Sequence, residues 1–242
     1  MKIRIKFRKY GPVRFIGHLD VMRFFQKAIR RAELDVVYTG GYSPHQVMTF
    51  AAPLGVGLES NGEYMDIEVN SLLSCQDITD RLNAVSVYGI EVVGTKILPN
   101  SVGNAMASVA AASYTVRFRE GREPNIDIEK VLPVFLAKDS ILITKATKKG
   151  SRELDLRSGI YEMSWDGNVF SMLVNASSAG NIKPIQIIEA LLAEHGETLQ
   201  ENALLVTRED MYTDISPEEE VHQFVSLGDI GDDKENGGTD EP

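Results

Sequence analysis

The sequence predicts an α+β protein built from two ferredoxin-like halves, each an α/β sandwich with an antiparallel sheet, followed by an acidic, disordered tail. Two observations support this prediction. Segments in which apolar and polar residues alternate, as in half-buried strands, are interleaved with segments that have the three- to four-residue spacing of amphipathic helices. In addition, a chain of 242 residues is long enough for two domains of about 100 to 120 residues each.

The first strand and the first helix have the clearest patterns. Ile3, Ile5 and Phe7 alternate with basic residues, which is the two-residue period of a strand with one buried face. A helix is predicted over residues 18–32, because apolar residues recur there at every third or fourth position. The basic residues of this helix fall on its opposite side: Arg23, Lys27, Arg30 and Arg31.

The other elements of the first half, residues 1–99, follow in the order expected for a ferredoxin-like domain, which is strand, helix, strand, strand, helix, strand. Glycine-rich turns separate several of them. We expect a short strand at 34–38, an extended segment at 46–50, a strand at 64–69, a helix at 76–84 and a strand at 90–98.

Residues 100–112 have little charge and many small side chains, so we expect a connector there. The second half, residues 113–216, partly repeats the order of the first. Its expected elements are strands at 113–119, 141–144, 153–157, 160–165, 169–175 and 204–207, and helices at 126–137 and 184–194. Residues 217–242 are acidic and poor in apolar side chains, which predicts disorder.

Composition excludes several classes of protein. No apolar run approaches the roughly 20 residues of a membrane-spanning helix, and the charged start of the chain lacks the apolar core of a secretory signal. The single cysteine, Cys75, cannot form an internal disulfide and is too few to hold an iron–sulfur cluster. The four histidines show no metal-ligand spacing. We therefore expect a cytoplasmic protein with no cofactor or metal of its own.

Charge is distributed unevenly along the chain. Residues 1–31 contain ten lysines and arginines against one aspartate, a net charge of +9, although the whole chain has a net charge of −10. The residues from 32 onward therefore have a net charge of −19. A basic first segment favours an anionic partner such as nucleic acid.

Four stretches of the first half share sequence features with a known family, and they are residues 15–23, 28–32, 38–45 and 50–57. They resemble the radical S-adenosylmethionine-associated (radical SAM-associated) proteins, a domain of unknown function found alone or fused to radical SAM enzymes. The resemblance is dense over about residues 1–70 and weaker through 149–157 and 181–188. The glycine loop departs from the family's usual Gly-Phe-Asn-Pro-His-Pro, since residues 41–46 are Gly-Tyr-Ser-Pro-His-Gln.

The resemblance implies association with a radical SAM enzyme that acts on RNA or a ribosomal target, and it implies no catalytic residue. Because this chain lacks cluster-binding cysteines, any radical chemistry would belong to the partner. Our leading hypothesis is a non-catalytic adaptor or substrate-recognition module for such an enzyme. The alternative is an enzyme or binding protein for an anionic small molecule, which would bind between Arg14, His18 and the loop of residues 40–45.

The basic face of the first strand allows two interpretations. Its lysines and arginines could follow a phosphate backbone. They could instead pair with Tyr64, Asp66 and Glu68, which the neighbouring strand would direct to the same face.

Other basic and polar residues complete the set of candidate binding sites. Backbone amides of the glycine loop and of the first helix start can bind anions, and the basic segment near residue 150 could contact RNA. The candidate anion- or RNA-binding residues are Arg14, His18, Arg23, Lys27, Arg30, Arg31, Gly41, Tyr42, Ser43, His45, Lys149, Arg152 and Arg157.

Overall fold

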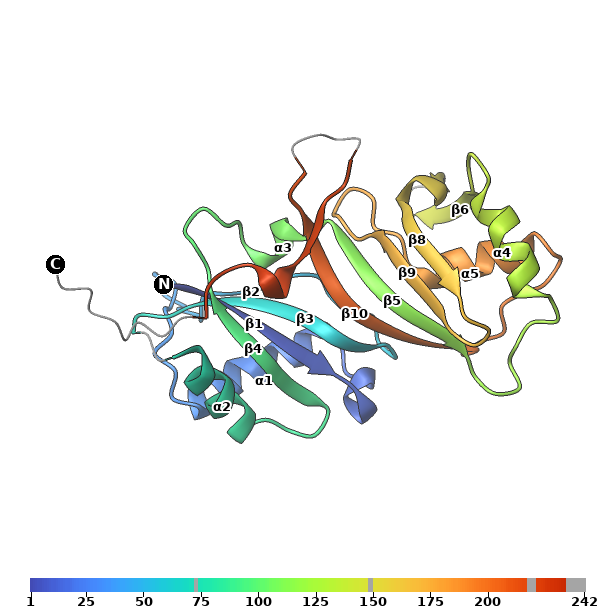
Figure 1. Ribbon diagram of the computed structural model, residues 1–242. Coiled ribbons are helices and arrows are strands. Elements are labelled where there is room, and N and C mark those ends of the chain that lie inside the picture. The colour runs from blue at the N-terminus through green and yellow to red at the C-terminus, as the bar shows by residue number, and fades with distance from the viewer. Residues whose placement is uncertain (72–73, 148–149, 217–220, 234–242) are drawn as a thin grey trace. The chain divides into compact units, whose positions relative to one another are not determined.

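The computed structural model describes residues 1–71, 74–147, 150–216 and 221–233, and shows a mixed α+β protein (Figure 1). The chain divides into two compact units. Unit 1 comprises Met1–Val109 and Asp210–Pro242, and unit 2 comprises Ala110–Glu209. Within the described ranges, no helix has the length and apolar character needed to cross a bilayer.

Unit 1 has the strand order of a ferredoxin-like domain. Its central strand β1 (Lys2–Lys9) lies between β4 (Ile90–Ile97) and β3 (Glu59–Glu68). The short strand β2 (Met48–Phe50) pairs with β3, and all of these pairings are antiparallel. The predicted fold class is therefore confirmed, with the order β4–β1–β3–β2.

Two helices cover one face of this sheet, α1 (His18–Arg31) and α2 (Cys75–Ala84) (Figure 1). The core lies between them and the sheet, where the alternate apolar residues of β1 are fully buried. The rings of Phe7 and Phe25 meet edge to face with 4.6 Å between centroids. Burial of each such side chain contributes about 1.5–3 kcal/mol, so the pattern that predicted the strand also holds the helix against it. The 3₁₀ turn η1 (Gly11–Phe15) precedes α1.

Unit 2 repeats the arrangement. Strand β5 (Ala111–Phe118) lies between β9 (Phe170–Asn175) and β10 (Leu204–Asp214), of which residues 204–209 belong to this unit. Strand β8 (Ile160–Trp165) pairs with the far edge of β9. This order, β10–β5–β9–β8, matches the order in unit 1. The unit's remaining elements are the helices α4 (Ile128–Leu136) and α5 (Pro184–Ala193), the 3₁₀ turn η2 (Arg157–Gly159), and an inserted hairpin of β6 (Leu142–Thr147) and β7 (Gly150–Asp155).

Several boundaries differ from the sequence-based prediction. The strand expected at residues 34–38 is reduced to two isolated bridges, Val36 to Val69 and Tyr38 to Gln46. Strand β3 begins at Glu59 rather than at residue 64, although residues 59–63 are mostly polar. They extend the strand because β1 provides the pairing partners, and tertiary pairing of this kind overrides local propensity. The connector contains a short helix, α3 (Ala105–Ser108).

The expectation of a disordered tail from residue 217 is wrong for residues 221–233. Strand β11 (Phe224–Ser226) pairs antiparallel with the end of β10, and a 3₁₀ turn, η3 (Leu227–Asp229), follows it. Leu227 is fully buried, and Asp232 exchanges backbone hydrogen bonds with Ile97 of β4. The acidic composition concealed this order because the backbone partners lie outside the segment, on the preceding strand β10 and on β4, which is far away in the sequence.

A truncation tests whether this segment stabilises unit 1. A chain that ends at Gln223 loses the burial of Leu227 and the hydrogen bonds of Ser226 and Asp232. We expect its free energy of unfolding in urea to fall by at least about 3 kcal/mol. A chain that ends at Asp233 keeps these contacts and should unfold like the full-length protein. Equal stability of the two truncated chains would contradict the structural role.

Candidate functional site

The face of the unit 1 sheet that points away from α1 and α2 has a buried ion pair at its centre. Arg4 donates from Nε and Nη2 to the two carboxylate oxygens of Asp66, at 2.8 and 3.0 Å. The two side chains are only 1% and 4% exposed. Such a bidentate salt bridge combines charge neutralisation with a fixed geometry. It therefore holds β1 and β3 in one register.

The other basic residues of β1 also have acidic or polar partners. Lys6 contacts Asp210 at 3.0 Å, and Arg8 contacts Glu91 at 3.3 Å and Asn61 at 3.0 Å. The register places Asp66, which was expected on this face, directly opposite Arg4. Of the two interpretations of this strand, ion pairing is therefore the one that the structure shows.

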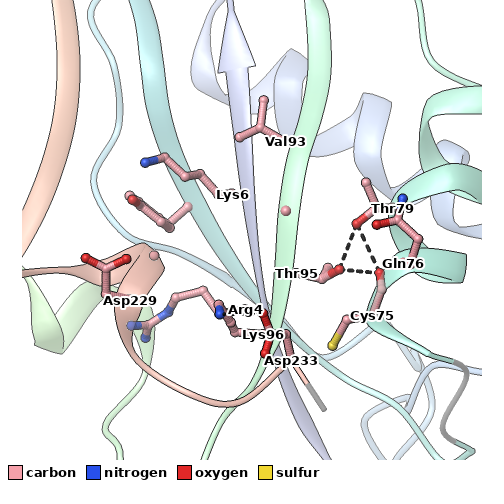
Figure 2. A pocket seen from close by; sticks show the side chains of 13 residues that line it. Arg4, Lys6, Cys75, Gln76, Thr79, Val93, Thr95, Lys96, Asp229 and Asp233 are labelled. Carbon is pink, nitrogen blue, oxygen red and sulfur yellow. Dashed lines mark hydrogen bonds and ion pairs between the residues drawn. The ribbon is translucent and has the colours of Figure 1, made fainter. Parts of the chain in front are cut away.

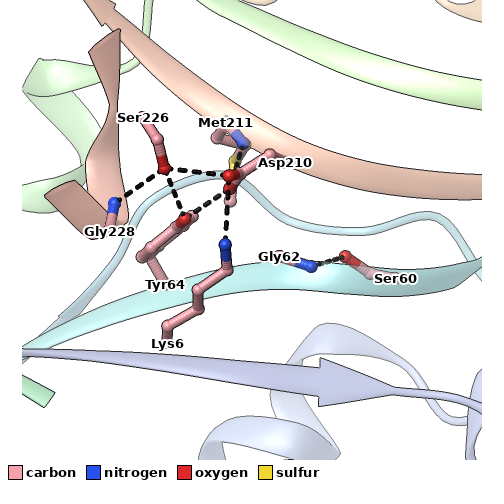
Figure 3. Close-up of polar contacts among 8 residues, drawn as sticks. All are labelled: Lys6, Ser60, Gly62, Tyr64, Asp210, Met211, Ser226 and Gly228. Atoms are coloured by element: carbon pink, nitrogen blue, oxygen red, sulfur yellow. Dashed lines mark hydrogen bonds and ion pairs between the residues drawn. The ribbon is translucent and has the colours of Figure 1, made fainter. Parts of the chain in front are cut away.

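A polar cluster links β1 and β3 to the returning end of the chain (Figure 3). The Tyr64 hydroxyl donates a short hydrogen bond to Asp210, which also accepts from Ser226 at 2.8 Å and from Lys6. Burial, followed by the neighbouring negative charge of Asp210, raises the pKa of Tyr64 far above its ordinary value. The phenol therefore stays protonated and acts as a hydrogen-bond donor throughout the physiological pH range.

A cavity of about 520 Å³ surrounds part of the edge strand β4: β1 and η3 line it on the polar face of the sheet, and α2 lines it on the other side (Figure 2). Its lining includes Arg4 and Lys6 of β1, Gly94, Thr95 and Lys96 of β4, and Asp229 of η3. The Thr95 hydroxyl contacts the Thr79 hydroxyl at 2.8 Å and donates to the Cys75 carbonyl at 2.5 Å. These bonds tie α2 to β4 along one wall, so the cavity has a defined shape.

The residues expected to form an anion site beside the glycine loop make separate contacts. Arg14 pairs with Glu59 at 3.1 Å, and its Nε is buried without a hydrogen-bond partner in the described part of the chain. The His18 ring packs edge-on against Phe50 at 5.1 Å between centroids. No described hydrogen bond or ion pair joins Arg14 or His18 to residues 40–45.

The glycine loop is exposed. Gly41, Tyr42, Ser43 and His45 all face solvent, and Gly41 has a positive φ of 95°. Within the loop, the Nδ1 atom of His45 lies 3.0 Å from the Thr39 hydroxyl, whose oxygen also accepts from the His45 backbone. The loop is thus closed by its own hydrogen bonds.

A stripe on the solvent side of α1 is the most exposed basic feature of unit 1. Its α1 residues follow one another at steps of three or four, which places them on one side of the helix, and Phe15 lies in η1 just before it. We call this set the α1 stripe, and it consists of Phe15, Leu19, Arg23, Lys27 and Arg30. Phe15 and Leu19 are 61% and 59% exposed. Arg31 lies beside the stripe and donates to the Val85 carbonyl at 3.0 Å.

The candidates in unit 2 have different roles. Arg152 is exposed on β7, whereas Arg157 donates to the carbonyls of Leu136 at 2.9 Å and Ile160 at 3.2 Å. Arg157 therefore closes a local turn, although its sequence resembles a family motif. Lys149 lies outside the described residues.

The described residues include no group of three or more His, Cys, Asp or Glu side chains that could hold a metal ion. Cys75 is buried, and this burial, together with the charge of Asp233, raises the pKa of its thiol. The thiol is therefore a poor nucleophile.

Comparison with protein families adds one finding. Residues 2–184 match the model of a family described as "Uncharacterized protein conserved in bacteria (DUF2344)". The chain belongs to this family. The family's matched region includes β1, the α1 stripe and the glycine loop, together with β4 and unit 2 as far as the start of α5. The family's description names neither a reaction nor a partner.

No curated protein matches the chain. Among solved structures, a chain in the crystal structure of a Cbf5-Nop10-Gar1 complex is similar, with a TM-score of 0.46 and 11% sequence identity. The match covers 86% of this chain and 48% of that chain, so this protein spans about half the length of its structural neighbour.

Two parts of unit 1 were missed by sequence reasoning. Asp210 and Ser226 of the polar cluster lie 146 and 162 residues from Tyr64. Lys96 and Gly94 of the cavity lie on a strand that had been assigned only by its apolar pattern. No local motif marks these positions, because their roles come from contacts across strands.

The protonation of Tyr64 can be tested by alkaline titration. Because its pKa is higher in the folded protein than in the unfolded chain, Tyr64 contributes stability below about pH 10 that is lost as the pH rises further. As the pH is raised, the phenolate absorbance of the Tyr64→Phe variant should equal that of the native protein for as long as both remain folded, because Tyr64 does not ionise in the folded protein. A smaller phenolate signal in folded Tyr64→Phe would contradict the assignment.

Proposed function

We propose that this protein is a non-catalytic recognition module, which binds RNA through the α1 stripe and serves a radical SAM enzyme as its partner. The observation that supports RNA binding most directly is the exposure of the basic residues of α1. Arg4, Lys6 and Arg8 of β1 are paired with carboxylates, whereas the α1 cations Arg23, Lys27 and Arg30 remain open to solvent.

The ion pairing of the α1 cations is weak or absent. Lys27 has no hydrogen bond or ion pair within the described ranges. Arg23 pairs with Asp20 at 3.1 Å, but both side chains are more than half exposed. Exposed pairs of this kind contribute about 0–1 kcal/mol, so a phosphate group can displace Asp20 at low cost.

The spacing of the stripe suits an extended anion. Residues four apart on a helix are separated by about 6 Å along its axis, so Arg23, Lys27 and Arg30 form a row of positive charge. A row of cations that neutralises several phosphates is the usual source of sequence-independent affinity.

An exposed aromatic ring lies at the other end of the stripe. Phe15 is 61% exposed, and the Arg14 guanidinium lies 4.8 Å from the centre of its ring. Unpaired RNA bases stack on aromatic rings and on guanidinium planes. The combination favours single-stranded RNA over duplex.

The partner enzyme is proposed from the family resemblance, and the positions of the resembling residues support a contact surface. The Gly57 amide donates to the Arg14 carbonyl at 2.8 Å, which joins the loop of residues 53–58 to η1. Two aliphatic side chains are exposed in these segments of the chain, Val56 of the loop at 60% and Leu19 of α1 at 59%. Exposed apolar side chains near a charged stripe are typical of a protein contact surface.

Substitution of two α1 cations tests RNA binding. Arg23→Gln combined with Lys27→Gln should weaken binding to a single-stranded RNA, because two phosphate contacts are lost. The slope of log affinity against log salt should fall by about 0.7 for each contact. Filter binding over a salt series measures both effects. Arg81→Gln with Lys138→Gln, which removes two exposed cations elsewhere, should bind like the native protein. Equal affinity of the two variants would contradict the role of the stripe.

Co-purification tests the partner. Tagged protein isolated from its own cells should recover a radical SAM enzyme, identified by mass spectrometry. Leu19→Asp should reduce this recovery at least about tenfold, since a charge in an apolar contact is costly. Val134→Asp, at a residue of α4 that is 67% exposed, is the matched control. Recovery of the enzyme at background level by the native protein would refute the adaptor hypothesis.

A further inference from the structure

We propose that the cavity of unit 1 binds a small molecule through an oxyanion group, a carboxylate or a phosphate, held between Arg4 and Lys96 (Figure 2). This site lies on the face of the sheet opposite α1, so it does not rest on the proposed RNA contact. Three features of the site support the proposal: the register of β1 and β4, the Nη1 atom of Arg4, which lacks a hydrogen-bond partner in the described part of the chain, and the open space beside Gly94.

The register places two cations next to each other. Arg4 of β1 and Lys96 of β4 are direct partners across the antiparallel pair, and both line the cavity. Like charges directly opposite each other on one face of a sheet repel. Asp66 pairs with Arg4 and the exposed Asp233 pairs with Lys96, and an anion bound between the two cations would reduce the repulsion further.

The Arg4 guanidinium has an unused donor. Its Nε and Nη2 atoms are bonded to Asp66, while Nη1 is buried and has no hydrogen-bond partner in the described part of the chain. A buried charged donor without an acceptor is costly. Since Arg4 lines the cavity, a ligand oxyanion bound there would supply the missing acceptor for Nη1.

Gly94 leaves room for a ligand. It lies opposite Lys6 in the register of β1 and β4, and a Cβ atom built there would meet no other atom within 4 Å. The cavity volume of about 520 Å³ falls within the range of about 300–1,000 Å³ that is typical of small-molecule sites. The Thr79 and Gln76 side chains of α2 add polar groups to the wall.

Two carboxylates of the lining limit the charge of the ligand. Asp229 and Asp233 line the cavity together with Arg4, Lys6 and Lys96. Asp233 accepts from Lys96 at 3.0 Å but is 68% exposed, so a ligand oxyanion can take its position. The lining thus suits a small ligand with one or two negative charges, and not a polyanion such as RNA.

Titration of the full-length protein with two probes tests the site. Inorganic phosphate and succinate are added separately, and amide resonances of ¹⁵N-labelled protein are followed. We expect one or both probes to shift the amides of Thr95 and Lys96 in a saturable manner. Gly94→Leu fills the cavity, and Lys96→Gln removes one cation, so each should weaken binding at least about tenfold. Lys138→Gln in unit 2 should leave it unchanged.

Each outcome decides the proposal. A saturable response to phosphate alone assigns the site to phosphorylated ligands, and a response to succinate alone assigns it to carboxylates. The absence of any saturable shift at these amides with either probe would overturn the proposal, as would native affinity in a folded Lys96→Gln. Because Arg23→Gln with Lys27→Gln leaves the cavity intact, loss of RNA binding and loss of oxyanion binding can be told apart.

Discussion

The buried ion pair between Arg4 and Asp66 is the constraint on which the rest of unit 1 depends. β1 is the central strand, and its side chains alternate between the apolar core and a polar face. A slip of one residue would bury charges against Phe25 and expose Ile3 and Ile5. It would also leave a guanidinium and a carboxylate unpaired, which is among the most costly changes in a protein interior.

This pairing also explains how charge is distributed over unit 1. The positive charges of Arg4 and Lys6 on the polar face of β1 are neutralised by carboxylates of the same unit, Asp66 on β3 and Asp210 on β10. The acidic end of the chain therefore completes the sheet face, with β11 and η3 packed onto it. The basic residues of α1 lie on the other side of the unit and have little compensation, which makes them the cations available to a partner.

The family assignment and the geometry support different levels of the proposed function. Membership of an uncharacterised bacterial family establishes relationship but no chemistry. The geometry shows that the polar cluster at Tyr64 is satisfied by its own hydrogen bonds, and that burial raises the pKa of the Cys75 thiol. The two proposed contacts use opposite faces of the sheet, so a module of this design could respond to a small ligand and to RNA separately.

The sequence by itself determined the elements whose signal is local. Alternation predicted β1 and the face on which Tyr64 and Asp66 lie, and helical spacing predicted α1 and the exposure of Arg23, Lys27 and Arg30. Local spacing works here because side-chain direction repeats with the backbone period. Only the tertiary structure decided the partners of Lys6 and Lys96, the cavity above Gly94 and the order of residues 224–233. Those features arise where strands distant in the sequence meet, and their stability comes from contacts that no single segment contains.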